Sequence, residues 1–361
     1  MNPLQRLHEF GQSPWLDFIR RDYIRDGRLA ALRDQGIRGV TSNPAIFEQA
    51  IAQSEIYDEE IQRLSAEGHD AMTIYDILSV ADVSEAADVF RPVWDESEGA
   101  DGYVSLEVSP LLAHDTNATI ADAHRLHRAV NRPNVMIKIP ATLAGIPAIR
   151  QCLADGIPIN VTLLFGRGRY ELVMKAYADA MQERADAGRS TAIASVASFF
   201  VSRVDTLLDP KLESLGRADL VGKLATANAL AAYGDFRTFF SDANFGELRR
   251  SGTPVQRILW ASTSAKNPAF SPVKYVEPLI GPDSVNTMPL NTIEAYLAQG
   301  DPADRADDEV PGALAILQEA KELGIDTEEV AAELEADAVQ KFVDPFQKLI
   351  SSIESKRLAL T

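Results

Sequence analysis

The fold of this chain is decided by residues 135–165, which read VMIKIPATLAGIPAIRQCLADGIPINVTLLF. Two short apolar runs, VMIKI (135–139) and INVTLLF (159–165), flank a longer segment at helical spacing. Strands joined by such a segment run parallel, because a parallel crossover needs about a dozen residues or more. The stretch therefore predicts a strand–helix–strand unit.

The same pattern recurs along the chain. The further apolar runs are WLDFI (15–19), IRGVT (37–41), YVSLEV (103–108), AIASVA (192–197), VQRILW (255–260) and SVNTMP (284–289). Eight strands alternating with helices predict an α/β fold, specifically a closed (β/α)8 TIM barrel. A doubly wound open sheet is the alternative, but no G-x-G-x-x-G motif follows the first strand.

Two regions of the sequence are additional to the strands and helices that a (β/α)8 barrel needs. Residues 45–98 predict a helical insertion, and residues 311–361 predict a C-terminal helical extension that packs on the barrel. Between barrel and extension, DPADRADDEV (301–310) is expected to be an exposed acidic connector. The whole chain, 1–361, is therefore expected to form a single barrel domain with added helices.

Composition excludes several classes of protein. The chain has 361 residues, 46% of them hydrophobic, and a net charge of −18, which argues against nucleic acid as the main partner. No uncharged apolar run approaches the roughly 18 residues of a membrane helix, and the N-terminus lacks a signal-peptide core. A soluble, cytoplasmic protein is expected. Cys152 is the only cysteine, which excludes an intramolecular disulfide and a cysteine-based zinc site.

Three of the predicted strands contain an ionisable residue where a buried parallel strand would be apolar. They are Asp17 in WLDFI, Glu107 in VSLEV and Lys138 in VMIKIP. Each alone is compatible with a strand-end charge or a structural ion pair. Together they predict two carboxylates and one amine meeting in the C-terminal mouth of the barrel, where TIM barrels carry their chemistry.

A lysine in that setting indicates covalent catalysis through a Schiff base. A free lysine amine is almost entirely protonated at pH 7, and burial favours the neutral, nucleophilic form. Neighbouring carboxylates favour the ammonium form instead, and the sequence leaves this balance open. Two carboxylates in different surroundings can divide the proton transfers that imine formation and carbon–carbon chemistry require.

Polar residues at other strand ends extend the predicted site. Thr41, Ser42 and Asn43 follow the second strand, and Pro44 is well placed to begin a helix that Ser42 or Asn43 would cap. Capping and a role in the site both remain open for these residues.

In INVTLLF, Asn160 and Thr162 share one face by the period-two rule. Both are polar in an otherwise apolar strand. An inward, hydrogen-bonding role is therefore expected for both side chains.

Six blocks of sequence together resemble the transaldolase family, in particular its long bacterial form. They are GVTSNPAIF (39–47), VSLEVSP (104–110), MIKIPAT (136–142), INVTLLF (159–165), SFFVSRVD (198–205) and WASTSAKNP (260–268). The resemblance runs from about residue 17 to residue 289. It implies a (β/α)8 barrel with the Schiff-base lysine on the fourth strand, here Lys138.

The resemblance also implies the reaction. A dihydroxyacetone unit would pass from sedoheptulose 7-phosphate to glyceraldehyde 3-phosphate, giving erythrose 4-phosphate and fructose 6-phosphate in the non-oxidative branch of the pentose phosphate pathway. No metal or organic cofactor is implied. The expected partners are small sugar phosphates, with no nucleic acid and no membrane, and the family includes monomers and homodimers.

Roles for individual residues follow from the same resemblance. Asp17 resembles the base that takes the C4 hydroxyl proton during cleavage. Glu107 and Thr162 resemble the pair that holds the water serving Schiff-base formation and hydrolysis. The expected substrate contacts are Thr41, Asn43, Asn160 and Ser198.

The phosphate end is expected beyond the sixth and seventh strands. Arg203 follows the sixth strand, and a guanidinium can bind phosphate through two parallel hydrogen bonds. Ser262 and Lys266 follow the seventh strand, whose loop commonly holds phosphate in TIM barrels. Some transaldolases carry an arginine near Lys266, so the second cation differs here. Residues 342–353 are a candidate for the family's helix over the barrel mouth, although ordinary packing explains their periodicity equally well.

Other readings of the sequence are weaker. His124 and His127 have a metal-like spacing but fall on an amphipathic helix, so a solvated surface is expected there. A fructose-6-phosphate aldolase-like activity would share Lys138 but release free dihydroxyacetone; Asp17 and Glu107 favour transfer. If the barrel only bound sugar phosphates without catalysis, we would expect the lysine or one of the carboxylates to be missing. Lys138, Asp17 and Glu107 are all present.

Overall fold

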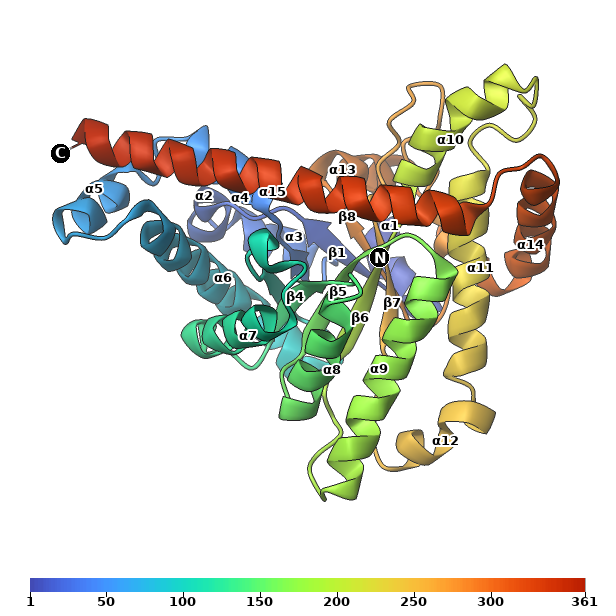
Figure 1. Cartoon of the computed structure of the whole chain (residues 1–361), viewed down its shortest axis with the longest axis horizontal. Helices are drawn as coiled ribbons and strands as arrows, with labels where there is room; N and C mark the ends of the chain where they lie inside the picture. Colours follow the sequence, from blue (N-terminus) through green and yellow to red (C-terminus); the bar gives the residue numbers. More distant parts are fainter. Residues whose placement is uncertain (361) are drawn as a thin grey trace.

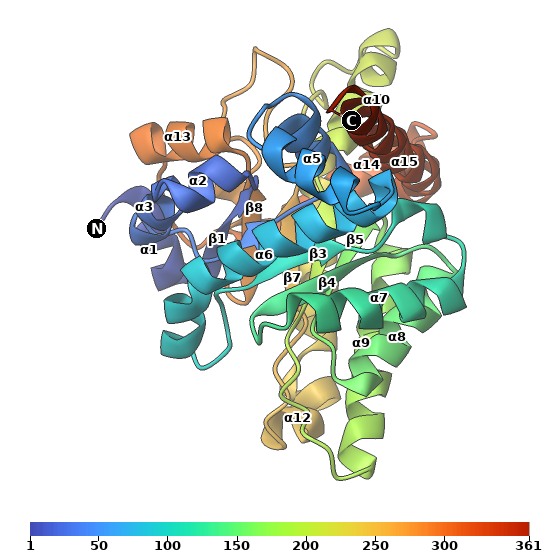
Figure 2. The same cartoon turned by 90° about the vertical axis from the view of Figure 1, so that its left-hand side faces the viewer.

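The computed structural model describes residues 1–360 as a closed barrel of eight parallel strands (Figures 1 and 2). Each strand pairs with the next in chain order, and the last pairs with the first. The strands are β1 (Gln12–Asp17), β2 (Val40–Thr41), β3 (Val104–Glu107), β4 (Val135–Pro140), β5 (Ile159–Leu164), β6 (Ser195–Phe200), β7 (Arg257–Ala261) and β8 (Ser284–Met288). The predicted (β/α)8 barrel is confirmed.

Helices surround the barrel and fill the connections between strands. The shorter connections contain α2 (Arg21–Arg25), α3 (Arg28–Asp34), α7 (Thr116–Val130), α8 (Gly145–Asp155) and α9 (Arg167–Asp186). Helix α1 (Pro3–Leu7) precedes β1, and α13 (Leu290–Gln299) follows β8. The longer connection between β6 and β7 contains α10 (Ser202–Ser214), α11 (Leu224–Phe239) and α12 (Asp242–Arg250).

The two regions expected outside the barrel are helical. Residues 45–98 hold most of α4 (Pro44–Phe47), the π-helical segment η2 (Glu48–Ala52), α5 (Asp58–Ala66) and α6 (Ala71–Glu96). The C-terminal part consists of α14 (Ala306–Glu322) and α15 (Thr327–Leu360). Thr361, the last residue of the predicted extension, lies outside the described residues.

The predicted start of the C-terminal helices, residue 311, is wrong by five residues. Helix α14 begins at Ala306, so half of the expected acidic connector is helical, and Pro311 lies inside the helix. A proline there removes one backbone donor and leaves the carbonyl four residues earlier unpaired. That carbonyl belongs to the exposed Asp307, where solvent can hydrogen-bond to it. The helix nevertheless continues through Pro311.

Helix α15 runs across the end of the barrel at which the strands terminate (Figure 1). It contacts α4, α5 and α6 along one part of its length and α10 and β5 along another. Lys348 pairs with Glu48 at 2.7 Å, and Lys356 pairs with Asp58 at 2.5 Å. Near its start, α15 is held by Glu328, whose carboxylate accepts two backbone N–H groups at the N-terminus of α9. The helix is thus fixed at both ends across the barrel mouth.

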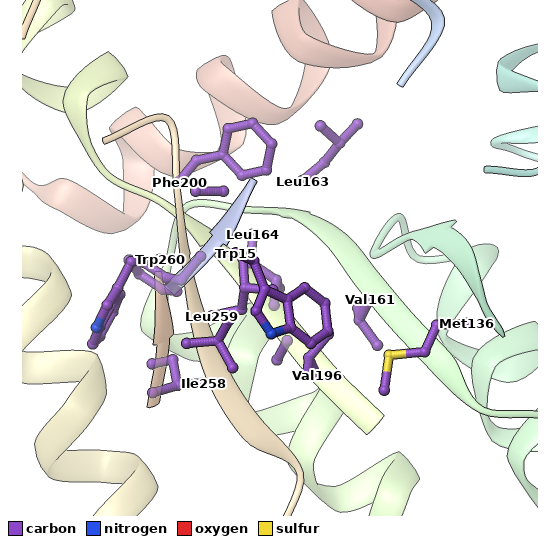
Figure 3. Packing of buried hydrophobic residues seen from close by; sticks show 14 of the residues in the cluster. Trp15, Met136, Val161, Leu163, Leu164, Val196, Phe200, Ile258, Leu259 and Trp260 are labelled. Atoms are coloured by element: carbon purple, nitrogen blue, oxygen red, sulfur yellow. The ribbon is translucent and has the colours of Figure 1, made fainter. Parts of the chain in front are cut away.

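The barrel interior is packed below this mouth by large side chains. Trp15, Met136, Val196 and Leu259 are buried and belong to β1, β4, β6 and β7 (Figure 3). A Cβ on Gly39 would lie 2.6 Å from the Trp15 ring, so only glycine fits where the second strand passes the indole. The packed interior closes the barrel from below and leaves its chemistry to the strand ends.

A buried ion pair attaches the insertion to the first strand–helix connection. Arg21 Nε donates to Asp82 Oδ1 at 2.7 Å, and the side chains are only 2% and 0% exposed. Tyr57 donates its hydroxyl to the other oxygen of Asp82, and Arg21 also pairs with Glu60. Substituting Arg21 would leave the Asp82 carboxylate buried without its cation.

We therefore expect Arg21→Met to lower the free energy of unfolding by about 3–5 kcal/mol, as when one partner of a buried pair is removed. Urea unfolding at pH 7 measures the change. Arg25→Met is the control, because the Arg25–Glu85 pair is 56% and 36% exposed and should contribute less than about 1 kcal/mol. Equal effects of the two substitutions would contradict the assignment.

No helix among residues 1–360 is long and apolar enough to cross a membrane.

Candidate active site

The lysine and one carboxylate of the predicted site meet at the ends of neighbouring strands. Glu107 on β3 and Lys138 on β4 are in register, so their side chains point to the same side of the sheet. Lys138 Nζ lies 3.8 Å from Glu107 Oε2, and the two side chains are 5% and 4% exposed. Lys138 Nζ also donates to the backbone carbonyl of Ser42 at 3.2 Å. A buried amine is therefore held beside a carboxyl group at the barrel mouth.

The second carboxylate lies in the same mouth but in different surroundings. Asp17 ends β1 in register with Thr41 of β2, whose hydroxyl donates to Asp17 Oδ1 at 2.7 Å. Thr41 Oγ1 also lies 2.7 Å from Thr287 Oγ1 of β8. Asp17, Thr41 and Lys138 line one cavity of about 220 Å³. The structure thus brings all three predicted charges together, as the strand order requires.

Burial raises the pKa of both carboxyl groups. For Glu107 the pKa rises to about 7, with the Lys138 ammonium opposing the rise and the Asp17 charge adding to it. For Asp17, burial raises the pKa, while Lys138 and the hydrogen bond from Thr41 oppose the rise. A carboxyl group that titrates near pH 7 can both donate and accept a proton at neutral pH.

The raised pKa of Glu107 has a consequence for stability. Because the folded state binds this proton more tightly than the unfolded state, stability falls as the pH rises from about 4.5 to about 7. We expect Glu107→Gln, which stays neutral, to be more stable than the wild type at pH 8 by about 3 kcal/mol. The difference should vanish near pH 4.

Urea unfolding at pH 8 and pH 4 measures both values. Glu322→Gln, at an exposed position on α14, is the control and should change little at either pH. A Glu107→Gln protein less stable than the wild type at pH 8 would show that the ionised carboxylate stabilises the fold.

The fifth strand places its two polar residues inward, as expected. Asn160 donates to Ser105 Oγ at 3.0 Å and accepts from Ser198 Oγ at 2.7 Å, which links β3, β5 and β6. Asn160 is also in register with Lys138. The buried hydroxyl of Thr162 has no hydrogen-bond partner among residues 1–360, and neither do the buried carboxylate oxygens of Glu107.

A break in strand geometry follows Thr162. Leu163 has a φ of 62°, and the register between β5 and β6 shifts between Val161 and Leu164. A left-handed conformation is costly for a bulky residue and persists only where the surrounding structure enforces it. Such bulges redirect side chains and occur often beside active sites. Here the bulge lies next to the hydroxyl that has no partner.

The structure shows which residue caps the helix that follows the second strand. Asn43 is the N-cap of α4, accepting from the backbone N–H of Ile46 at 3.0 Å, and Pro44 is the first helical residue. Ser42 instead donates to the carbonyl of Ser105. Asn43 also lines the cavity beside Lys138, so the capping role and the place in the site coexist.

The expected phosphate ligands surround an adjoining cavity of about 460 Å³. Arg203, Ser262 and Lys266 line it, and all three also line the cavity that contains Lys138. Arg203 Nη1 is buried and has no hydrogen-bond partner in the described part of the chain. Burial lowers the pKa of the Arg203 guanidinium, and the Asp337 carboxylate opposes that effect. Lys266 is exposed, and its Nζ donates to Ser264 Oγ at 2.6 Å.

Helix α15 adds two residues to the mouth. The Phe342 ring centre lies 5.7 Å from Lys138 Nζ. The first residue of the segment 342–353, a candidate for the helix over the barrel mouth, therefore lies against the amine. Lys341 lines both cavities, and the sequence offers only its place before Phe342 as a signal. Further residues line the cavity beside Lys138, although the sequence assigns them no individual role: Ala45, Phe200, Ala261, Ser264, Thr287 and Pro289.

The histidines excluded from the site lie elsewhere. His124 on α7 pairs with Asp155 of α8 at 2.8 Å and is partly exposed. In the described residues no group of three or more His, Cys, Asp or Glu side chains is placed to hold a metal ion.

Comparison with known proteins gives consistent matches. Residues 14–353 match the family model described as Transaldolase/Fructose-6-phosphate aldolase. Transaldolase 2 of Nostoc sp. (strain PCC 7120) is 44% identical over 372 residues, covering 99% of this chain and 98% of that protein. Transaldolase of Parafrankia sp. (strain EAN1pec) is 44% identical over 98% of both chains. Transaldolase of Mycobacterium tuberculosis (strain H37Rv) is 44% identical over 97% of this chain and 96% of that protein.

Proposed function

The chain belongs to the transaldolase/fructose-6-phosphate aldolase family and is a transaldolase, and we propose that Lys138 carries its reaction as a Schiff base. The observation that carries this proposal is the Lys138 amine, buried beside Glu107 and sharing a cavity with Asp17. The enzyme transfers a dihydroxyacetone unit from sedoheptulose 7-phosphate to glyceraldehyde 3-phosphate. The products are erythrose 4-phosphate and fructose 6-phosphate.

Schiff-base formation needs an amine nucleophile and a proton shuttle. The neutral Lys138 amine attacks the C2 carbonyl of the ketose and gives a carbinolamine. The hydroxyl group of the carbinolamine leaves as water after it gains a proton. Glu107 supplies that proton through a water held with Thr162, a role supported by their buried, unpartnered oxygen atoms.

Cleavage then needs a base near the C4 hydroxyl group. Asp17 takes the C4 hydroxyl proton, the C3–C4 bond breaks, and its electron pair passes to the iminium nitrogen. The shortened aldose leaves, and the enamine remains on Lys138 until it attacks the acceptor aldehyde. Asn160, fixed between Ser105 and Ser198, and Asn43 hold the hydroxyl groups of the bound three-carbon unit.

The phosphate group of donor or acceptor lies beyond the three-carbon unit. Arg203 has an unpartnered guanidinium nitrogen, and Ser262 and Lys266 line the same side of both cavities. Opposite charge and several donors make this the anion-binding side of the mouth.

One assay separates this function from fructose-6-phosphate aldolase-like activity, the second candidate. The enzyme is given fructose 6-phosphate with and without erythrose 4-phosphate. Transfer predicts sedoheptulose 7-phosphate and glyceraldehyde 3-phosphate only when the acceptor is present. Free dihydroxyacetone formed at a similar rate without acceptor would favour the aldolase, and no conversion in either sample would favour a binding protein.

We further propose that the enzyme acts in the cytoplasm on free sugar phosphates, as a monomer or a homodimer. Its strong negative charge leaves local cations such as Arg203 to attract anionic substrates. Light scattering distinguishes the two oligomeric states.

A further inference from the structure

Helix α15 presents a line of charged residues to the outer, 460 Å³ cavity. Glu333, Asp337 and Lys341 all line it and follow one another at intervals of four residues, so they share one face of the helix. Lys341 Nζ pairs with Asp337 Oδ2 at 2.5 Å. Of these three residues, Lys341 alone also lines the inner cavity that contains Lys138. The mouth of the site is therefore completed by a cation from outside the barrel.

The barrel side of the same cavity carries positive charge as well. Arg203 and Lys266 face it, and Arg203 Nη1 is buried without a partner among residues 1–360. The Asp337 carboxylate is close enough to influence Arg203 as well as to pair with Lys341. The Asp337 carboxylate thus places a negative charge beside Arg203 and Lys341, as a bound phosphate group would.

We propose that Lys341 is a further phosphate-binding residue of this enzyme and that the Asp337 carboxylate competes with the substrate phosphate for it. The inference rests on the proposed function and adds a residue of α15 to its phosphate site. The Lys341–Asp337 pair is 58% and 45% exposed, and exposed pairs of this kind contribute little to stability. Exchange of the carboxylate for a phosphate dianion therefore costs little and gains a stronger, charge-assisted contact.

The position of Lys341 also connects the two ends of the substrate. The next residue, Phe342, lies over the Lys138 amine. When Lys341 binds the phosphate, the same turn of α15 covers the reacting carbon atoms. Phosphorylated sugars then hold this turn in place more firmly than unphosphorylated sugars do.

Titration with inorganic phosphate tests the inference without any Schiff-base chemistry. We expect Lys341→Met to weaken phosphate binding about tenfold, the value of one charge-assisted hydrogen bond reduced for solvent exposure. Asp337→Asn should tighten binding about threefold, because a competing negative charge is removed. Lys341→Arg should retain most of the affinity. Lys175→Met, which removes a lysine of a similarly exposed i,i+4 pair on α9, is the matched control and should bind as the wild type does.

Steady-state kinetics give a second readout. Lys341→Met should raise KM for fructose 6-phosphate far more than it lowers kcat, and its effect on fructose itself should be much smaller. Unchanged phosphate binding in Lys341→Met, or weaker binding in Asp337→Asn, would overturn the inference. The two proposals fail separately. If phosphate binding does not change but the Lys138 adduct still forms in these variants, only the inference about Lys341 is wrong. If no Lys138 adduct forms in the wild type, the proposed function itself is wrong.

Discussion

Replacing Lys138 with alanine is expected to abolish transfer, lowering kcat about 10⁴-fold or more, as when an enzyme loses its covalent nucleophile. Two other lysines in the described part of the chain line the inner cavity, Lys266 and Lys341, and we assign both to phosphate binding instead. Without the Lys138 imine, the C3–C4 bond has no electron acceptor. A coupled assay of glyceraldehyde 3-phosphate release from fructose 6-phosphate and erythrose 4-phosphate measures the loss.

The fold should survive this substitution. Lys138→Met keeps most of the side-chain volume and removes the cation that lowers the pKa of Glu107, so the buried carboxyl group becomes protonated and neutral. Unfolding midpoints of both variants should stay near that of the wild type, so that lost activity reports lost chemistry. Near-normal turnover by Lys138→Ala in a folded protein would rule out the Schiff-base mechanism.

Replacing Asp17 with asparagine is expected to separate imine formation from cleavage. The amide retains the size of the side chain and can still accept the hydrogen bond that Thr41 donates at 2.7 Å. It cannot take the C4 hydroxyl proton, so cleavage should slow by about 10²–10⁴-fold, the usual contribution of general base catalysis. The Schiff base with fructose 6-phosphate should still form and accumulate.

Borohydride trapping and turnover, measured on the same Asp17→Asn sample, check both parts. The expected sample contains a full equivalent of trapped adduct and almost no product. Thr41→Val is the matched control, because it removes the hydrogen bond to Asp17 but keeps the carboxylate, and it should lose far less activity. If Asp17→Asn forms no adduct, the carboxylate acts in imine formation, and its assignment to cleavage is wrong.

Much of the fold could be predicted because its signals are local. Each barrel strand lies in or overlaps one apolar run, and the crossover lengths between runs require parallel strands. A closed parallel barrel brings all strand ends to one mouth, so an ionisable residue near the end of a strand must meet the others there. The convergence of Asp17, Glu107 and Lys138 follows from that rule, given that all three side chains face the barrel interior.

Other features depend on contacts that the sequence does not specify. The left-handed Leu163 and the register shift beside it could not be predicted, because leucine itself disfavours that conformation. Helix α14 continues through Pro311, although proline disfavours a helix interior and usually marks a helix end in a sequence. The place of Lys341 depends on the path and rotation of α15 across the mouth, and no periodicity fixes either of them.

In the proposed mechanism Lys138 forms the covalent intermediate. To test this, the protein is incubated with fructose 6-phosphate, borohydride is added, and the reduced adduct is mapped by mass spectrometry. We expect a single modified peptide that contains Lys138, and the modification should be absent from Lys138→Ala. No adduct, or an adduct on another lysine, would rule out this mechanism and make the charges in the barrel mouth structural.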